Sequence, residues 1–431
     1  MPPSPLWKRA VMAACLGILP PAAAAQAPSQ PSPAVRTLSD AYQRALAASE
    51  SVAINEQAIR QAEDLYRRAF GTSMPAFSYR TLTTWVGGSP AFATGAMSQT
   101  DAGFRVAQTN LTFYRELAAV RQAKSVVGIQ EETYLRARQL LLAAVASAFY
   151  GQLQAKENVL TALQLKDLAG QRLEKLHEWV RVGRSREADA LAQDSQISSL
   201  DSQREESERQ VSARSDLLTY LTLAPVEPST DDAPIADAPK PLETYLARLE
   251  TRPDVKAVRN AADASEAAVR VARGDRFPQL SFFGDAYNSR PGSRMAARWD
   301  AQLTVSVPLF QWGALNAEVA FAKDGLAAQR LALQQARRQA DLDIRNAYRD
   351  DLSARRQLEI QRRAVDLAER DFELQRRDEA RGLVTAIDVL QSLDRLNTSR
   401  LARANALLNA RLAAINLEIA AGAKPEELDL R

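Results

Sequence analysis

The chain has 431 residues, 46% of them hydrophobic and 25% charged, and a formal net charge of +3. This high and balanced charge content argues against a membrane protein built of many apolar helices, and the small excess argues against the basic surface of a nucleic-acid-binding protein. The chain contains a single His and a single Cys, which argues against His/Cys metal sites, disulfide frameworks and catalytic triads. We therefore expect no cofactor, no bound metal, no enzymatic activity and no nucleic-acid partner.

The first 25 residues have the pattern of a secretory signal peptide. Lys8 and Arg9 precede a short apolar run over 10–19, and the small residues at 23–25 end before Gln26. The apolar run is too short to span a bilayer, so a single membrane anchor is the weaker interpretation. Lipidation of Cys15 is a second alternative, but the apolar run continues beyond this residue. We expect cleavage after residue 25, an N-terminal tail over 26–36, and an exported protein.

The remainder of the chain contains two copies of one long unit. Residues of the same type recur at an almost constant spacing, as in the pairs Val52 and Val255, Gly71 and Gly274, Pro75 and Pro278, Val120 and Val319, Gly183 and Gly382, and Asp189 and Asp388. A proline-rich polar segment separates the copies. The sequence thus predicts a first repeat over 37–224, an inter-repeat linker over 225–241, a second repeat over 242–423 and a C-terminal tail over 424–431.

Each repeat is expected to have the order helix, strand, strand, helix, tight turn, helix. Two proline-free stretches predict unbroken helices over about 115–181 and 314–380, because proline breaks helix interiors. Shorter helices are predicted over 39–70, 187–223, 242–273 and 386–421. Alternation of apolar and polar residues predicts strands over 75–86, 104–113, 277–287 and 299–309, joined by loops over 87–103 and 288–298.

The second long helix carries two apolar seams with a seven-residue period. The seams are formed by Leu358, Val365 and Phe372 and by Ile360, Leu367 and Leu374. Residues two apart on a helix point about 200° apart, so the seams face opposite flanks. A two-stranded coiled coil needs only one seam, so we expect neighbours on both sides, as in a closed wall of helices; a simple coiled-coil bundle is the alternative. The lengths predict that 187–223 stacks with 242–273, and 386–421 with 39–70, each stack matching one long helix.

The predicted strands are long enough to cross a bilayer when tilted, at about 10 residues each. Only helices and closed barrels span a membrane, because unpaired strand edges are costly there. Four strands are too few, since about eight is the practical minimum for a barrel. Several copies must therefore pool strands, and the closed helical wall favours three copies, with about 12 strands in all. A small soluble sheet that caps a helical bundle is the alternative.

Two local motifs add to this order of elements. The turn at 381–390, RGLVTAIDVL, is similar to the Gly-Leu-x-x-x-x-Asp-x-Leu tip of the TolC-like outer-membrane efflux proteins, and VGRSREADAL at 182–191 is its counterpart in the first repeat. The strand-to-helix junction VPLFQWG at 307–313 is similar to the Pro-Leu-Phe-Asp-x-Gly of the same family, with Phe113 and Tyr114 in its place in the first repeat. The chain resembles this family over nearly all of its mature length.

The resemblance implies a mainly helical fold with β-strands and an internal two-fold repeat. Long antiparallel coiled-coil helices would form a periplasmic α-barrel, and the four strands of each chain would enter a trimeric transmembrane β-barrel of about 12 strands. It further implies a homotrimer in the cell outer membrane, in contact with outer-membrane lipid, that serves as the exit duct of a tripartite efflux or type I secretion system. Its partners would be a periplasmic adaptor protein and an inner-membrane transporter. A periplasmic coiled-coil scaffold without a pore is the alternative function.

The resemblance also carries over individual residues at the two tips. The adaptor-contact residues would be Val182, Gly183 and Arg184 in the first repeat and Arg381, Gly382 and Leu383 in the second. Asp189 and Asp388 match the carboxylates that line the closing aperture, where three copies of an inward aspartate would form a ring of negative charge. A helix N-terminal cap is the alternative role for each aspartate. The family's closing contacts are not matched, since Glu379 and Val384 stand at those positions; nearby arginines that could pair with the aspartates instead are Arg181, Arg184, Arg186, Arg377 and Arg381.

Overall fold

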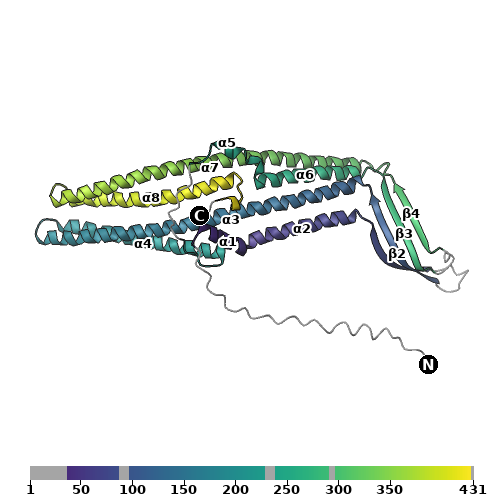
Figure 1. Ribbon diagram of the computed structural model, residues 1–431, viewed down its shortest axis with the longest axis horizontal. Helices are drawn as coiled ribbons and strands as arrows, with labels where there is room; N and C mark the ends of the chain where they lie inside the picture. The colour runs from purple at the N-terminus through teal and green to yellow at the C-terminus, as the bar shows by residue number, and fades with distance from the viewer. Residues whose placement is uncertain (1–35, 87–96, 229–237, 291–296, 429–431) are drawn as a thin grey trace, which may run out of the picture. The chain divides into compact units, whose positions relative to one another are not determined.

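The structure is a computed structural model that describes residues 36–86, 97–228, 238–290 and 297–428. The expected signal peptide, Cys15 and nearly all of the expected N-terminal tail lie outside the described residues, as do the middle of the inter-repeat linker and the tips of both strand-connecting loops. The described chain is mostly helical and contains one antiparallel sheet of four strands (Figure 1). This confirms the predicted fold class, mainly helical with four β-strands.

The two repeats have the same order of long elements. The first contains α1 (Leu38–Ala48), α2 (Glu50–Thr72), β1 (Ala76–Val86), β2 (Met97–Leu111), α3 (Tyr114–Arg181) and α4 (Glu187–Thr222). The second contains α5 (Leu242–Leu246), the 3-10 helix η3 (Leu249–Thr251), α6 (Pro253–Gly274), β3 (Gln279–Ser289), β4 (Trp299–Ser306), α7 (Ala314–Ala380) and α8 (Ala386–Ala420), followed by the 3-10 helix η4 (Pro425–Glu427). Both long helices agree with the predicted ranges to within one residue.

Two helices that were predicted to be continuous are interrupted. The helix expected over 242–273 stops after α5 and restarts at Pro253, the first residue of α6. A proline disfavours helical backbone in the residue before it, and Arg252 accordingly has φ −59° and ψ 136°. The helix expected over 39–70 is divided at Ser49, whose hydroxyl caps α2 by accepting a hydrogen bond from the amide of Val52. In both repeats a short helix therefore leads into a longer one.

The strands differ from the prediction at their ends. β2 begins at Met97 instead of residue 104, because residues 97–103, which were assigned to the loop, pair with β1 in unbroken register as far as Val86. β3 runs two residues further than expected at its end, and β4 stops at Ser306, shortly before Pro308, which has no amide hydrogen to continue the ladder. Gly103 allows β2 and β3 to approach closely, since a Cβ there would lie 2.2 Å from the carbonyl oxygen of Ala286.

A similar backbone turn leads from the strands into each long helix. Gly313 precedes α7 with φ +86°, a left-handed conformation that glycine adopts without strain. Phe113 takes this place in the first repeat with φ +56°, which is unusual for a bulky residue. Thr112 supports the strained turn, because its hydroxyl accepts a hydrogen bond from the amide of Arg115 at 3.1 Å. The junction motif of the second repeat therefore has a structural counterpart in the first.

The helices lie side by side in one layer. α2 and α4 contact α3, whereas α6 and α8 contact both α3 and α7 and so lie between them, with α6 toward the sheet (Figure 1). The end of α4 contacts α1, and the end of α8 is joined to the start of α6 through Arg252, which donates to the carbonyl oxygen of Ala420 at 2.9 Å. The predicted stacking partners were therefore wrong. Length could not identify them, because the short helices are similar in length.

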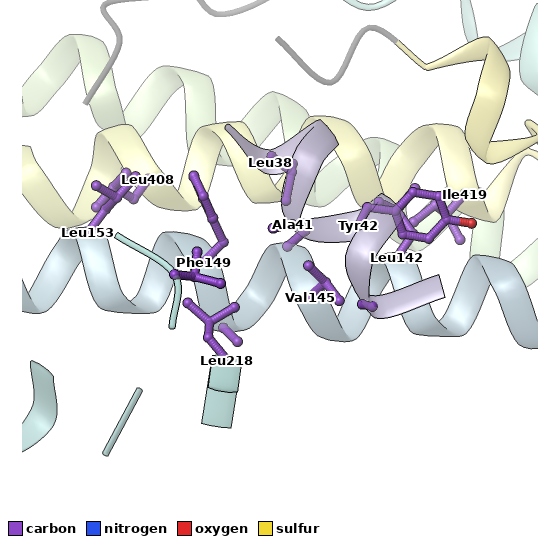
Figure 2. Packing of buried hydrophobic residues seen from close by; sticks show 14 residues of the cluster. Leu38, Ala41, Tyr42, Leu142, Val145, Phe149, Leu153, Leu218, Leu408 and Ile419 are labelled. Atoms are coloured by element: carbon purple, nitrogen blue, oxygen red, sulfur yellow. The ribbon is translucent and has the colours of Figure 1, made fainter. Parts of the chain in front are cut away.

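A buried apolar cluster joins the helices of both repeats near the middle of α3 (Figure 2). It takes side chains from α1, α3, α4 and α8, which include Leu38, Tyr42, Leu142, Val145, Phe149, Leu218, Leu408 and Ile419. Burial of apolar side chains of this size stabilises by roughly 1.5–3 kcal/mol each. The cluster therefore holds the end of α4 and the C-terminal half of α8 against the middle of α3.

The two apolar seams of α7 have different surroundings within one chain. The seam formed by Leu358, Val365 and Phe372 is buried, with exposed fractions of 4%, 1% and 7%. The seam formed by Ile360, Leu367 and Leu374 is exposed to 62%, 66% and 55%. The chain thus supplies a neighbour for one flank of α7 and leaves an apolar stripe on the other.

Candidate functional site at the helical turns

Each helical hairpin closes through the same hydrogen-bonded turn. After α3, Gly183 has φ +72°, the amide of Arg184 donates to the carbonyl oxygen of Trp179 at 2.8 Å, and the amide of Gly183 donates to that of Val180 at 3.1 Å. These two bonds define a Schellman motif, which requires a residue that tolerates positive φ. Gly382, with φ +75°, occupies the corresponding place after α7 and has the same pair of bonds. The two predicted tips are therefore structurally equivalent.

Both tips present apolar side chains. Val182 and Leu383 are exposed to 68% and 70%, one at each turn. Arg184, which stands where Leu383 stands in the second turn, places its guanidinium over the ring of Trp179 at 5.9 Å. Arg381 is exposed at the second turn. Each tip thus combines one accessible aliphatic side chain with one arginine, although the order of the two is reversed.

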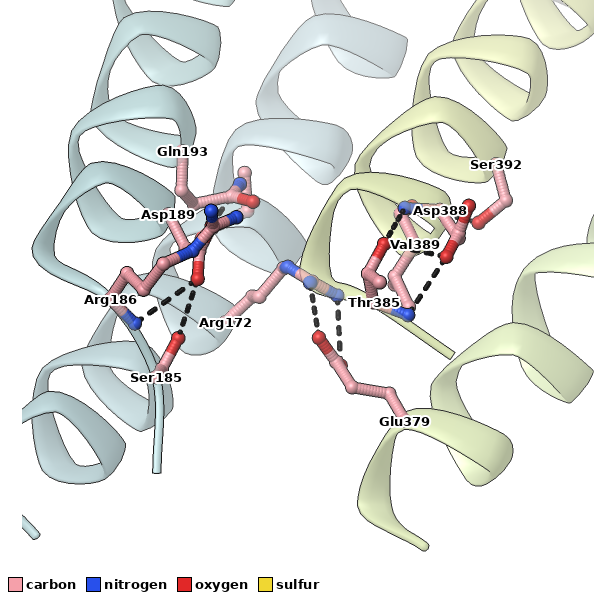
Figure 3. Close-up of polar contacts among 11 residues, drawn as sticks. Arg172, Ser185, Arg186, Asp189, Gln193, Glu379, Thr385, Asp388, Val389 and Ser392 are labelled. Atoms are coloured by element: carbon pink, nitrogen blue, oxygen red, sulfur yellow. Dashed lines mark hydrogen bonds and ion pairs between the residues drawn. The ribbon is translucent and has the colours of Figure 1, made fainter. Parts of the chain in front are cut away.

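Asp189 caps the first helix after the turn. One of its carboxylate oxygens accepts hydrogen bonds from the amide of Arg186 at 3.1 Å and from the hydroxyl of Ser185 at 3.0 Å, while the guanidinium of Arg186 donates to the other at 3.1 Å (Figure 3). Partial burial raises the pKa of Asp189, but the hydrogen bonds from Arg186 and Ser185 outweigh it and hold the pKa below its usual value. The ionised carboxylate stabilises the start of α4.

Asp388 has the same role in the second hairpin. Its carboxylate accepts from the amide of Thr385 at 2.8 Å and from its hydroxyl at 2.6 Å, and the Thr385 hydroxyl accepts from the amide of Asp388 at 3.4 Å. This reciprocal arrangement is a capping box. The hydrogen bonds from the Thr385 side chain and amide lower the pKa of Asp388. Within one chain, helix capping accounts for both predicted aperture residues, whereas a charged ring requires several chains.

One of the arginines expected to pair with the tip aspartates does so. Arg186 contacts Asp189 at 3.1 Å, whereas Arg381 pairs with Asp378 at 3.7 Å. Among the contacts of the described residues, no arginine reaches Asp388. The second predicted aperture residue therefore owes its low pKa to hydrogen bonds alone.

An ion pair between the two hairpins was missed by the sequence interpretation. Arg172 of α3 donates to both carboxylate oxygens of Glu379 of α7, at 2.5 and 3.1 Å (Figure 3). The two side chains are exposed to only 10% and 8%. Burial lowers the pKa of Arg172 and raises that of Glu379, in spite of their mutual attraction. The pair is therefore a buried charged contact that joins the two repeats close to their tips.

A signal for this pair was present in the seam pattern. Glu379 follows Val365 and Phe372 at the same seven-residue interval and so occupies a buried seam position of α7. Arg172 falls between the buried Ala169 and Leu176 at helical spacing on α3. A charge at a seam position needs a partner, and opposite charges on two such seams predict that the two helices meet.

A cluster of buried apolar side chains from both hairpins accompanies the ion pair between Arg172 and Glu379. Leu165, Leu200, Phe372, Val389 and Leu393 belong to one buried cluster, to which all four helices of the two hairpins contribute.

In the ranges that the structure describes, no three His, Cys, Asp or Glu side chains are grouped as a metal site would need. No helix of the described chain is long and apolar enough to cross a membrane.

Comparison with known proteins identifies the family of the second repeat. Residues 245–423 match the family model described as outer membrane efflux protein. No curated protein matches the chain by sequence.

Solved channels share the fold. The CusC channel gives a TM-score of 0.80 at 17% identity, over 93% of this chain and 96% of that one. VceC from Vibrio cholerae gives 0.78 at 17% identity, over 90% and 96%. CmeC from Campylobacter jejuni gives 0.78 at 17% identity, over 94% and 92%. At such low identities, the likeness establishes the fold.

The family match and the fold agree with the sequence expectations. The family is one of transport components and not of enzymes, and its members act as efflux channels of the outer membrane. The description of the matched family model agrees with the predicted location in the outer membrane. Residues 245–423 belong to the outer membrane efflux protein family, and the described chain has the fold of the TolC-like channels of that family.

Proposed function

We propose that the protein is the exit duct of a tripartite efflux pump or a type I secretion system. In this role a homotrimer conducts its cargo passively across the outer membrane. A periplasmic adaptor and an inner-membrane transporter supply the coupling and the energy. The observation that carries the proposal is the four-stranded sheet, whose two faces and two edges are suited to a membrane only when several copies combine.

The two faces of the sheet have opposite character. One face carries exposed apolar side chains that include Phe77, Trp85, Phe104, Trp299 and Leu303. Phe77 and Phe104 stack at 5.6 Å between ring centroids. The other face carries charged side chains, for example Arg105 and Asp285. A transmembrane barrel alternates apolar residues toward lipid with polar residues toward its lumen, so the apolar face is suited to lipid.

The edges of the sheet require partners. The strand order is β1-β2-β3-β4, so within the described chain β1 and β4 each have one free edge. A free edge in lipid leaves amide and carbonyl groups without hydrogen bonds, at a cost of several kcal/mol each. Pairing of β1 with β4 of a neighbouring copy removes both edges, and three copies give a closed barrel of about 12 strands.

The helical layer, like the sheet, has two flanks that require contacts with neighbouring copies. α2 and α4 lie at one flank of the layer and α7 at the other. The exposed seam of α7, formed by Ile360, Leu367 and Leu374, is an apolar stripe without a partner among the described residues of the chain. Packing of this stripe against the α2–α4 flank of the next copy would close the helices into a barrel continuous with the strands.

The tips are the proposed contacts of the adaptor. Val182, Gly183 and Arg184 form one contact surface, and Arg381, Gly382 and Leu383 form the other; the accessible aliphatic side chain of each tip supports this assignment. Asp189 and Asp388 are proposed to line the aperture in the trimer. Hydrogen bonds within each chain lower the pKa of both carboxyls, which favours the charged form that a ring of negative charge requires.

Membrane fractionation followed by planar-bilayer recording tests the proposal. We expect an outer-membrane protein that requires detergent, runs as an SDS-resistant trimer and conducts ions after reconstitution. Recovery as a soluble periplasmic rod, or as a membrane protein that forms no pore, would refute the duct and favour a scaffold. Adaptor docking is tested separately by cross-linking from Leu383→Cys to the adaptor, with the exposed Leu331→Cys of α7 as the control.

A further inference from the structure

The charged side chains of the sheet all lie on one face. β1 contributes Arg80, β2 contributes Asp101 and Arg105, β3 contributes Asp285 and β4 contributes Asp300. The strand register places Arg105 opposite Asp285, and Asp285 opposite Asp300. A row of charges therefore crosses three neighbouring strands.

Arg105 and Asp285, the first two neighbours in this row, form a strong ion pair. Arg105 donates from Nε to one oxygen of Asp285 at 2.8 Å and from Nη2 to the other at 2.7 Å. The two side chains are largely buried against the sheet. The guanidinium of Arg105 also lies 5.4 Å from the ring centre of Phe283. Such a bidentate pair fixes the geometry of both groups.

The next pair of neighbours in the row, Asp285 and Asp300, would repel each other without further contacts. Asp285 and Asp300 are cross-strand neighbours of like charge, an arrangement that destabilises a sheet. Asp300 is compensated by Arg290, whose Nη2 lies 3.0 Å from its carboxylate, and by the hydroxyl of Tyr287, which donates to it at 3.1 Å. Arg290 in turn lies over the Tyr287 ring at 4.0 Å. Each of the two adjacent aspartates thus has an arginine of its own.

The row can face only the lumen of the proposed barrel. The opposite face presents the exposed aromatic side chains, and charged groups toward lipid would be costly. Asp300 lies near the start of β4 and Arg290 directly follows β3, whereas Arg105 and Asp285 lie near the middle of β2 and β3. The row therefore crosses the sheet between its middle and the end remote from the helices, which in the proposed duct is the outer end.

We infer that Arg105, Asp285, Asp300 and Arg290 form a charge-balanced row that lines the lumen of the barrel and contributes to its selectivity between small cations and anions. This inference rests on the proposed channel. Three copies bring two adjacent carboxylates each to the lumen, and the two arginines of each copy cancel their field. The row therefore allows ions of both signs to pass, and removal of either a positive or a negative side chain gives it a net charge.

Reversal potentials across a salt gradient in planar bilayers test the inference. The wild-type trimer gives the reference permeability ratio of K⁺ to Cl⁻, which includes the contribution of the proposed aperture ring of Asp189 and Asp388. Asp300→Asn should shift the permeability ratio toward Cl⁻, and Arg105→Gln should shift it toward K⁺, each by about twofold or more. The double variant Arg105→Gln with Asp285→Asn removes one charge of each sign, so its reversal potential should stay near that of the wild type.

A second measurement leaves the ion pairs intact. Thr304→Cys places a thiol on the face of Asp300, and Leu303→Cys places one on the apolar face. Cationic and anionic thiol reagents should shift the reversal potential in opposite directions at position 304 and leave it unchanged at position 303. Conducting trimers in which no charge variant and neither reagent moves the reversal potential would overturn the inference. Absence of any conductance from the wild-type trimer would instead refute the channel itself.

Discussion

Arg172 of α3 and Glu379 of α7 form a buried bidentate ion pair, at 2.5 and 3.1 Å, between helices of different repeats. The pair lies close to the turns, next to the apolar cluster that joins the two hairpins. The pair occupies seam positions that otherwise hold apolar residues, so its net effect on stability is the balance of two opposing contributions. Removal of two charges from water is costly, and their attraction offsets this cost only when the geometry is good.

Single and double substitutions at this pair should have opposite effects. Arg172→Met leaves a buried carboxylate without its main partner and should destabilise the protein by about 3 kcal/mol. The double variant Arg172→Met with Glu379→Leu removes both charges and should recover most of the loss. Thermal unfolding in detergent, followed by the helical circular dichroism signal, gives the comparison.

The exposed pair Arg363 and Glu359 of α7 is the matched control. Its atoms are as close, at 2.5 Å, but both side chains are exposed to solvent. Exposed pairs contribute little, so the same double substitution there should not shift the unfolding midpoint measurably. A double variant at the buried pair that is as unstable as the single variant would contradict the prediction.

Alanine at either turn glycine should cost stability through the backbone alone. Gly183 and Gly382 have φ of +72° and +75°, and an added Cβ would meet no atom within 4 Å. The expected loss is about 1–2 kcal/mol for each substitution, the cost of the left-handed conformation for a residue with a Cβ. Asparagine tolerates this conformation better, so Gly382→Asn should unfold at a higher temperature than Gly382→Ala. Equal midpoints for the two variants would contradict the strain explanation.

Two substitutions in the second capping box separate a structural role of Asp388 from an electrostatic one. Thr385→Ala removes the hydroxyl half of the box and keeps the charge, whereas Asp388→Asn removes the charge. If a ring of Asp388 carboxylates narrows the aperture, Asp388→Asn should raise the conductance or weaken cation block, and Thr385→Ala should do neither. Equal changes in both variants would indicate that capping is the whole role of the residue.

Acid should weaken both capping interactions. The pKa values of Asp189 and Asp388 are lower in the folded chain than in the unfolded chain. A depressed carboxyl pKa adds stability that is present above the usual aspartate value of about 4 and is lost as the pH falls through the folded value. The unfolding midpoint of the wild type should therefore fall below about pH 4 more steeply than that of the double variant Asp189→Asn with Asp388→Asn. Parallel pH profiles would contradict this assignment.

The two seams of α7 predict different defects for similar substitutions. Val365→Lys places a charge in the interior of the chain and should prevent folding, because Val365 is 1% exposed. Leu367→Lys, two residues away on the exposed seam, should leave the helical signal intact and abolish the SDS-resistant trimer. Retention of the trimer by Leu367→Lys would show that this seam does not contact another copy.

Much of the fold follows from patterns of long range in the sequence. The proline-free stretches predicted α3 and α7 because a helix of that length cannot contain a proline, and the repeated Gly183 and Gly382 marked both turns. Strand alternation identified β4 more closely than β2. In β2 the small residues before Phe104 resemble a loop, and only their pairing with β1 shows that they form a strand.

The contacts of the site were harder to predict from the sequence than the fold, for physical reasons that differ between residues. The capping role of Asp388 is local and was recognised as an alternative, because Thr385 stands three residues earlier. The partnership of Arg172 with Glu379 depends on which helices meet, and the stacking of the short helices was assigned incorrectly. Seam positions that carry charge would have been the better guide, since such charges must find each other in the folded chain.

The number of chains in the native particle is the most direct test of the central claim, that free edges and an exposed seam of one chain are completed by other copies. Native mass spectrometry of the protein extracted in detergent from the outer-membrane fraction measures it. The structure predicts a particle of three chains, in which the four-stranded sheets close into one barrel. A particle of one or two chains that still conducts ions would contradict the account.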